Sequence, residues 1–458
     1  MRRSAILITA IVIAGCAGDR PPLPPASAVA PPNGWRTDLG PGAPIAADWW
    51  SAFGDSVLTQ LVARGLANNV DIAVAAERVE EARAQQRLAE AQRQPGLTAG
   101  APLTEARALN AFGVPAVNTG FQPALQASYD LDLFGRLRQA SRAARAQLLA
   151  SEGAADAVRL AVASGIASAY ITLRGLDARL AVARETLSAR AEGLRIARRR
   201  ADAGYTSALE LHQSEAEYRA AQQLVPQLEL AISRQENALS LLIGDPPAGI
   251  GRGLPLARLR TPAIPDGLPA DLLRRRPDLF QAEQTLVAAD RTLDSARAAL
   301  LPSVSLTGSA GLVLSTALSD PVGVFSLGGS VLAPIFDAGR LRAQVDAAEA
   351  RRDQAAFSYR RSALTAFREV EDSLAGVRRS GEQARALIGQ RDALAAALRN
   401  ATNRYRAGYS SYLEQLDAQR GLLSAELGAI QAETDRLSSY VALYQAMGGG
   451  WRGAAPAP

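Results

Sequence analysis

The amino-acid sequence repeats itself once, and the spacing of this repeat limits what the chain can fold into. The segment Arg200–Tyr205 returns as Arg404–Tyr409, at an offset of 204 residues. Further upstream the offset is 207 residues, since Asp71 is matched by Asp278. A spacing that is kept over more than 200 residues predicts that each half of the chain builds the same structural unit.

Two proline-free stretches predict very long helices. The chain has 25 prolines, but none lies between Pro123 and Pro226 or between Pro334 and Pro456. Proline breaks helix interiors, so these stretches, which are rich in Ala, Arg, Leu, Glu and Gln, permit long helices. Apolar residues step by threes and fours along them, as in narrow coiled-coil seams. The pattern predicts one helix over Arg136–Ala203, about 100 Å long.

Shorter segments between the predicted helices alternate apolar and polar residues, which predicts four β-strands. They lie at 97–110, at 121–133, at 303–312 and around Phe325 to Ile335. A tilted strand of about ten residues crosses a bilayer. Four strands cannot close a barrel, and lipid does not tolerate an open sheet edge. The chain is therefore expected to share its barrel with copies of itself, and a dimer or a trimer would both satisfy this argument.

The N-terminus predicts a lipid anchor. Arg2 and Arg3 precede the apolar run Ala5–Ile13, which is shorter than the roughly 20 residues that span a bilayer and so is typical of a signal peptide. The run ends at Cys16, the only cysteine of the chain, in a sequence that resembles a bacterial lipobox. Ala17 follows instead of the aspartate that marks inner-membrane retention, which implies the outer membrane. No later segment has about 20 consecutive apolar residues, so no transmembrane helix is expected.

Composition gives the expected order of segments along the chain. Pro/Gly-rich stretches separate the two repeats from each other and from the N-terminus. Within the second of these stretches, Gly249–Gly253 lacks a dinucleotide fingerprint and is interpreted as a flexible turn. The expected segments are a lipoprotein signal peptide at 1–15, a lipid-anchored Pro-rich tether at 16–47, a first repeat of helices and two strands at 48–244, a linker at 245–267, a second repeat of helices and two strands at 268–451, and a C-terminal tail at 452–458.

The residue inventory argues against an enzyme. One histidine and one cysteine exclude a Cys/His metal cluster, and the absence of lysine excludes a P-loop and a Schiff-base site. We therefore expect no catalytic residue, no metal and no cofactor. The 50 basic and 45 acidic residues are interleaved along the helices, without a basic block. This distribution argues against a nucleic-acid partner.

A series of motifs resembles those of the outer-membrane efflux protein family, the TolC-like exit ducts, in its lipoprotein branch. The motifs occur in order at Leu272–Asp278, Leu301–Leu306, Phe336–Arg340, Glu369–Leu374, Arg404–Gly408, Leu416–Arg420 and Gly448–Trp451. The resemblance implies a mainly helical fold with transmembrane strands, in which a homotrimer shares a twelve-stranded barrel and a helical tunnel crosses the periplasm. It implies a passive duct in the outer membrane for drugs or other small molecules, which works with a periplasmic adaptor and an inner-membrane transporter.

Two alternatives to this function stay open. The same duct could serve a type I protein secretion system. A periplasmic coiled-coil scaffold or adaptor is the other alternative, but it would lack the period-two strands and would contain a lipoyl-like β domain. One departure from a regular helix is Pro226, which is expected to kink the returning helix of the first half.

The two helix-to-helix tips are candidate adaptor contacts. Glycine there permits the left-handed backbone that reverses the chain, and a nearby small residue can cap the returning helix. The glycines could also serve only to close the hairpins. The resemblance assigns the adaptor-contact tips to Arg200, Gly204, Ser207, Arg404, Gly408 and Ser411.

The helix after the second tip carries a candidate periplasmic gate. Leu413, Asp417 and Arg420 lie at i, i+4 and i+7, and so share one helix face. The resemblance implies an apolar ring from the leucine and an ionic ring from the aspartate and arginine. The alternative is an ordinary surface ion pair at i, i+3. At the equivalent positions the first half has Leu209, Gln213 and Ala216, so the charged set belongs to one hairpin only.

Overall fold

The structure is a computed structural model that describes residues 21–37, 44–109 and 112–451. The predicted signal peptide at 1–15, Cys16 and the tail at 452–458 lie outside the described residues. The described chain divides into two compact units, and each unit takes segments from both halves of the sequence. Unit 1 contains 21–29, 77–152 and 281–361, and unit 2 contains 30–76, 153–280 and 362–451.

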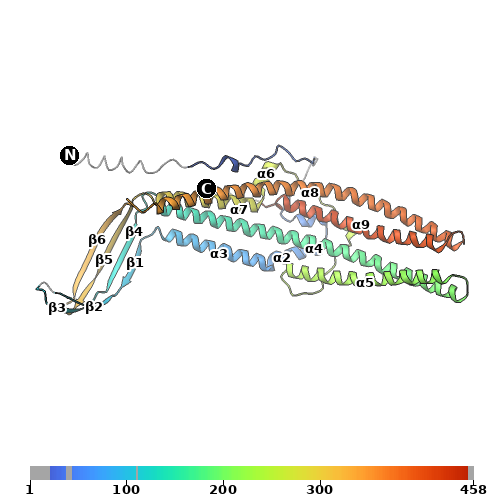
Figure 1. Cartoon of the computed structure of the whole chain (residues 1–458), viewed down its shortest axis with the longest axis horizontal. Helices are drawn as coiled ribbons and strands as arrows, with labels where there is room; N and C mark the ends of the chain where they lie inside the picture. Colours follow the sequence, from blue (N-terminus) through green and yellow to red (C-terminus); the bar gives the residue numbers. More distant parts are fainter. Residues whose placement is uncertain (1–20, 38–43, 110–111, 452–458) are drawn as a thin grey trace. The chain divides into compact units, whose positions relative to one another are not determined.

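Unit 1 contains one antiparallel sheet (Figure 1). Its strands are β1 (Gly96–Gly100), β2 (Leu103–Leu109), β3 (Pro115–Phe121), β4 (Ala124–Asp130), β5 (Ser303–Ser315) and β6 (Val322–Leu332). β1 pairs with β4, β2 pairs with β3, both β3 and β4 pair with β5, and β6 pairs with the other side of β5.

These six segments make four continuous strands. Gly100 pairs with Ala124 and, beyond Pro102, Leu103 pairs with Phe121, so the register moves by three residues on each chain without a slip. The pairing of β4 and β3 with β5 keeps one register in the same way. Proline has no N–H group and so cannot donate a ladder hydrogen bond, which explains the breaks at Pro102 and before Ala124. The prediction of four strands is confirmed.

The bounds of two predicted strands were partly wrong. The fourth strand was placed around Phe325 to Ile335, whereas β6 ends at Leu332, just before Pro334, which cannot donate a ladder hydrogen bond. The alternation placed the second strand at 121–133, whereas β3 and β4 run from Pro115 to Asp130. Leu131 still donates its backbone N–H to Val304 (2.8 Å), but the next residues leave the sheet. Asp132 then caps the following helix, because its carboxylate accepts from the N–H of Leu137 at 3.0 Å. The apolar leucines of this turn continued the alternation in the sequence beyond the end of the sheet.

The sheet has one polar and one apolar face. Serine hydroxyls pair across β5 and β6 on the polar face, at 2.8 Å for both Ser305–Ser330 and Ser309–Ser326. The opposite face carries exposed apolar side chains, namely Leu125, Leu306, Phe325, Leu327 and Val331. An exposed apolar surface of this size is typical of contact with lipid or with another protein.

The long helices of the two halves match in length. α4 (Arg136–Asp202) and α8 (Arg340–Arg406) each have 67 residues, and α5 (Ala208–Leu242) and α9 (Tyr412–Ala446) each have 35 (Figure 1). Both pairs are therefore related by the 204-residue offset at each end. The predicted helix at 136–203 is confirmed to within one residue. α5 continues as a helix through Pro226.

Shorter helices complete the fold. Two of them, α3 and α7, are related by the 207-residue offset. The short elements are η1 (Pro25–Ser27), η2 (Trp49–Phe53), α2 (Ser56–Asn68), α3 (Val70–Ala91), η3 (Leu256–Arg258), α6 (Pro269–Arg275) and α7 (Pro277–Ala298).

The main hydrophobic core lies in unit 2. Trp49 is 2% exposed and stacks on Tyr444, with 5.2 Å between the ring centroids. Ile166, Tyr170 and Leu173 of α4 are fully buried in the same core. Among the described helices, only α4 is long and apolar enough to cross a membrane, and the core helix of a soluble protein can meet the same two criteria. The burial of these α4 side chains explains its apolar stretch as a core segment.

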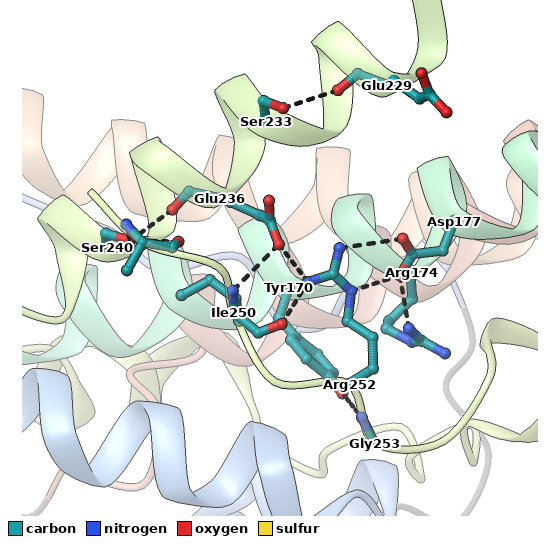
Figure 2. A network of polar contacts seen from close by, with 11 residues as sticks. Tyr170, Arg174, Asp177, Glu229, Ser233, Glu236, Ser240, Ile250, Arg252 and Gly253 are labelled. Atoms are coloured by element: carbon teal, nitrogen blue, oxygen red, sulfur yellow. Dashed lines mark hydrogen bonds and ion pairs between the residues drawn. The ribbon is translucent and has the colours of Figure 1, made fainter. Parts of the chain in front are cut away.

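The linker between the halves is fastened to α4 and α5, as Figure 2 shows for Arg252. The Arg252 guanidinium pairs with Asp177 of α4 at 3.0 Å and with Glu236 of α5. The N–H of Gly253 donates to the Tyr170 hydroxyl at 2.9 Å. A Cβ atom at Gly253 would overlap Asp55, so only glycine fits. The interpretation of Gly249–Gly253 as a flexible turn was wrong, because these side chains hold the segment in place.

Candidate functional site

Both helix-to-helix tips close with the same backbone hydrogen bonds. In the first tip, Gly204 has φ of 75°, the N–H of Tyr205 donates to Arg200 O (2.8 Å), and the N–H of Gly204 donates to Ala201 O (3.0 Å). The second tip repeats both bonds around Gly408, whose φ is 78°. This is the Schellman motif, in which glycine adopts the left-handed conformation after a helix. No atom lies within 4 Å of a Cβ built on either glycine, so both tips are open.

The predicted serine caps differ between the tips. The Ser207 hydroxyl accepts from the N–H of Glu210 at 3.3 Å, as expected for an N-cap. Ser411 occupies the N-cap position of α9, but its side chain makes no capping hydrogen bond. At this tip an ion pair between Arg404 and Glu414 (3.4 Å) joins the two helices instead. The capping prediction was therefore wrong for Ser411.

Tyr405 joins the two tips to each other. Arg200 donates to the Tyr405 hydroxyl at 2.8 Å, and this hydroxyl in turn donates to Glu210. The Arg200 guanidinium also lies over the Tyr405 ring, 5.4 Å from its centroid. Burial, helped by the hydrogen bond to Glu210, raises the pKa of Tyr405 to about 12. The phenol is therefore neutral and bridges a cation and an anion.

A second polar cluster, further along the same helices, centres on Glu217 of α5. One carboxylate oxygen accepts from Arg420 Nε of α9 at 2.7 Å, and the other lies 3.3 Å from Arg190 Nη2 of α4. Glu217 and Arg190 are buried, whereas 57% of the Arg420 side chain is exposed. Burial lowers the pKa of Arg190, and the charge of Glu217 opposes this effect. The cluster thus joins α9 to both helices of the first hairpin.

The candidate gate residues are only partly brought together. Arg420 pairs with Glu217 and not with Asp417, so the ordinary i, i+3 ion pair is not the arrangement found. Asp417 is exposed, and it has no ion pair or side-chain hydrogen bond within the described ranges. Leu413 is 58% exposed on the same helix face. This face of α9 is therefore open within a single chain.

The sequence reasoning missed three residues that organise this region, namely Arg190, Glu217 and Tyr405. Each of them is a departure from the internal repeat. The equivalent residues, 204 positions away, are Leu394, Gly421 and Ala201, respectively. An ionic or hydroxyl group that appears in only one half is a signal that could have identified them.

The described residues offer no metal site. No group of three or more His, Cys, Asp or Glu side chains among residues 21–37, 44–109 and 112–451 is arranged to hold an ion. His212, near the first tip, is an exposed residue of α5. The chemistry of this region is therefore that of ion pairs and hydrogen bonds between helices.

A family comparison identifies the protein class. The family model described as "Outer membrane efflux protein" matches residues 61–245 and again 268–449. The chain belongs to the outer membrane efflux protein family. This outer-membrane efflux protein is accordingly a channel and not an enzyme. The mainly helical fold with a small antiparallel sheet, and the role as the outer-membrane channel of a tripartite efflux pump, are confirmed.

Individual relatives agree with this assignment. The chain is 38% identical to the solvent efflux pump outer membrane protein SrpC of Pseudomonas putida, over 87% of this chain and 86% of SrpC. The crystal structure of the Campylobacter jejuni CmeC outer membrane channel superposes with a TM-score of 0.86, at 25% identity, over 96% of both chains. The open state of the Neisseria gonorrhoeae MtrE outer membrane channel gives 0.82, at 30% identity, over 94% of this chain and 98% of MtrE.

Proposed function

We propose that three copies of this efflux protein form one exit duct of a tripartite pump. The observation that carries the proposal is the four-stranded sheet. Within the described chain, the outer edges formed by β1/β2 and by β6 have no partner strand. Unpaired N–H and C=O groups are too costly in lipid, so other copies must supply the missing strands. Three copies would give a closed barrel of twelve strands, the number implied by the family resemblance.

The cargo of such a duct is small organic molecules. The Pseudomonas putida relative is named for solvent efflux, which favours this cargo over a secreted protein. The polar sheet face, with its paired serines, suits the water-filled side of the barrel, and the apolar face suits lipid. A duct of this kind provides a passage, while the inner-membrane transporter and the adaptor select the cargo and drive its movement.

The closed state is held by the two polar clusters at the tips. Two contacts join the second hairpin to the first. Tyr405 binds Arg200 and Glu210, and Arg420 binds Glu217. In a trimer the open face of α9 would turn to the axis, where three Asp417 carboxylates repel each other and three Leu413 side chains narrow the passage. Partly exposed polar contacts of about 1 kcal/mol each could be offset when an adaptor docks.

The adaptor contact is assigned to the two tips, which present Gly204 and Gly408 in open space. Bulky replacements there should reduce efflux. Cross-linking to the adaptor is the second readout, because it separates docking from folding. If export and cross-linking both survive in the Gly204→Leu/Gly408→Leu variant while the trimer is intact, the docking role is wrong.

A lipid anchor at Cys16 would hold each chain in the outer membrane, with the helices extending into the periplasm. A single acyl chain gives marginal membrane binding, and two or more make it stable. The Cys16→Ser variant should incorporate no acyl group. Mass spectrometry that finds an unmodified Cys16 in the mature wild-type protein would contradict the anchor.

The decisive experiment is the mass of the detergent-solubilised protein together with its conductance. Light scattering, corrected for bound detergent, should give three times the mass of the processed chain, which lacks the signal peptide. The same preparation should form channels in planar bilayers. A monomer that retains the four-stranded sheet and conducts ions would refute the shared barrel.

A further inference from the structure

Two hollows meet where the strands of unit 1 give way to its long helices. The first has a volume of about 400 Å³, and the second, beside it, about 620 Å³. Arg136 and Arg340, the first residues of α4 and α8, line both hollows. Both arginines are therefore shared by the two hollows.

The two hollows differ in chemistry. Leucine, valine and phenylalanine side chains dominate the smaller one, including Leu133, Phe134 and Leu332. The larger one is lined by alanines together with Thr292, Ser295 and Gln344. Asp130 and Asp132 also line the smaller hollow, and Arg351 also lines the larger one. Leucines beside two shared arginines, with small and polar residues beyond them, suit a phospholipid, whose phosphate lies between its acyl chains and its polar headgroup.

The guanidinium groups of Arg136 and Arg340 have donors to spare. Arg136 lies 3.6 Å from Asp130, and Arg340 lies 4.0 Å from Asp337, which are both long for an ion pair. Neither guanidinium donates a hydrogen bond to any of the described residues. Asp337 is engaged elsewhere, because it accepts from the N–H of Leu341 at 2.8 Å and so caps α8. A phosphate oxygen could therefore bind these donors without displacing a strong internal contact.

The surroundings place this boundary at a membrane surface. Ile335 is 95% exposed and Phe336 is 90% exposed, five and four positions before Arg340. Apolar side chains that stand free beside arginines are typical of the interface between hydrocarbon and headgroups.

The N-terminal tether independently limits where the membrane surface can be. Arg352 of α8 is buried and donates to the carbonyl oxygens of Pro21 (2.7 Å) and Pro22 (3.2 Å). Pro21 lies five positions after Cys16, and five residues of chain span at most about 18 Å. Twelve helical residues from Arg352 back to Arg340 cover about the same distance. An acylated Cys16 can therefore reach the level of Arg340.

We propose that Arg136 and Arg340 bind the phosphate of a phospholipid from the periplasmic leaflet, with its acyl chains along Leu133, Phe134 and Phe336. The inference rests on the proposed function, because it requires the strands to lie in the outer membrane. The lipid fills the apolar hollow at the base of the sheet and fixes the depth of the duct in the bilayer. Guanidinium groups suit this role, since they bind phosphate oxygens through paired N–H donors.

Lipid binding to the purified, delipidated protein tests the proposal. The probe is dihexanoyl phosphatidylglycerol, and the competitor is glycerol phosphate, which has the same phosphate but no acyl chains. The Arg136→Gln/Arg340→Gln variant should bind the lipid about tenfold more weakly. The Arg138→Gln/Arg342→Gln variant is the matched control, because it removes the same charge from the same helix turns, and these arginines do not line the hollows. It should keep the affinity within about twofold.

Three results would overturn the site. They are equal losses in the two double variants, equal competition by glycerol phosphate, and no binding to the wild-type assembly because a neighbouring copy fills the hollow. Mass and conductance of the same preparation separate this outcome from failure of the duct itself. A conducting trimer that binds no lipid contradicts the site alone, whereas a preparation without channels contradicts the proposed function.

Discussion

The first hairpin (α4 and α5) and the second hairpin (α8 and α9) share a backbone but not a set of polar contacts. Their helices have equal lengths, and their tips close around Gly204 and Gly408 with the same hydrogen bonds. In the second hairpin Arg404 pairs with Glu414 of its own returning helix. The equivalent Arg200 and Glu210 of the first hairpin instead both bind Tyr405, which belongs to the second.

This difference shows where the two hairpins are distinguished. A duplicated backbone alone gives two equivalent hairpins, so any difference between them must come from the side chains. The ion pair that joins the hairpins, between Glu217 and Arg420, has the small residues Gly421 and Ala216 at the equivalent positions. The duplicated backbone hydrogen bonds close each tip, whereas the ion pair that joins the two hairpins occurs only once.

The hairpin ends far from the tips show the same principle with different side chains. In the first half, the Asn69 amide donates to Leu242 O, near the end of α5, at 2.9 Å. In the second half, the Arg276 guanidinium donates to Ala446 O, at the end of α9, at 3.1 Å, and also binds Asp278 and Glu369. The equivalent carbonyl groups of the two halves are thus both bonded, one by a neutral donor and the other by a charged donor.

The largest effect is expected where the duplicated backbone is most crowded. Gly448 has φ of 90°, and a Cβ atom there would overlap the carbonyl oxygen of Arg275. Gly448→Ala should cost about 4 kcal/mol or more and reduce the yield of assembled channel. Gly408→Ala is the control, with a similar φ of 78° but open space, and should cost about 1 kcal/mol. Thermal melting of the detergent-resistant assembly measures both, and equal costs would contradict the overlap argument.

The next effect compares the two donors at the hairpin ends. Arg276→Met leaves the carboxylates of Asp278 and Glu369 without their buried cation, so it should destabilise the protein by about 3 kcal/mol. Asn69→Ala removes only neutral hydrogen bonds and should cost about 1 kcal/mol. Chemical denaturation of both variants gives the difference. If Asn69→Ala lowers the free energy of unfolding more than Arg276→Met does, the charged donor does not stabilise the hairpin end more than the neutral one.

The gate prediction tests the unduplicated contacts directly. Replacing Asp417 and Arg420 together by alanine removes the Glu217 contact and, in the proposed trimer, the carboxylates at the axis, so single-channel conductance in planar bilayers should rise. A loss of about 1 kcal/mol from the closed state lowers the ratio of closed to open channels by about fivefold. Gln213→Ala, at the equivalent position of the first hairpin, should leave conductance unchanged. The same conductance in the double variant and in the wild type, both as intact assemblies, would place the constriction elsewhere.

The smallest effect concerns the Tyr405 hydroxyl. Tyr405→Phe should cost less than about 1.5 kcal/mol, because Arg200 and Glu210 can then pair directly as Arg404 and Glu414 do. The folded-state pKa of about 12 lies above the ordinary 10.0, so this stabilisation is complete below pH 10 and is lost as the pH rises toward 12. Tyrosinate absorbance during an alkaline titration of the wild type and of Tyr405→Phe measures the pKa of the Tyr405 phenol. A wild-type protein whose phenols all titrate near 10 would refute the buried bridge.

Much of the fold could be predicted from the sequence, because proline-free spans and strand alternation are local signals. The limits of α4 and the number of strands followed from them. The bounds of β3 and β4 did not, since leucines in the turn after Asp130 continue the alternation while the sheet itself has ended. Of the candidate gate, the helix face could be predicted from spacing. The partner of Arg420 could not, since Glu217 lies 203 residues away and pairing across hairpins depends on packing.

The equal helix lengths have a consequence for how such a chain can change during evolution. Both tips must end side by side for Arg200 to meet Tyr405, so a turn gained or lost in α4 and α5 has to be matched in α8 and α9. The strand hairpins are under no such constraint, and the change of offset from 207 to 204 falls within them. Insertions should therefore accumulate singly among the strands and only in matched pairs along the helices.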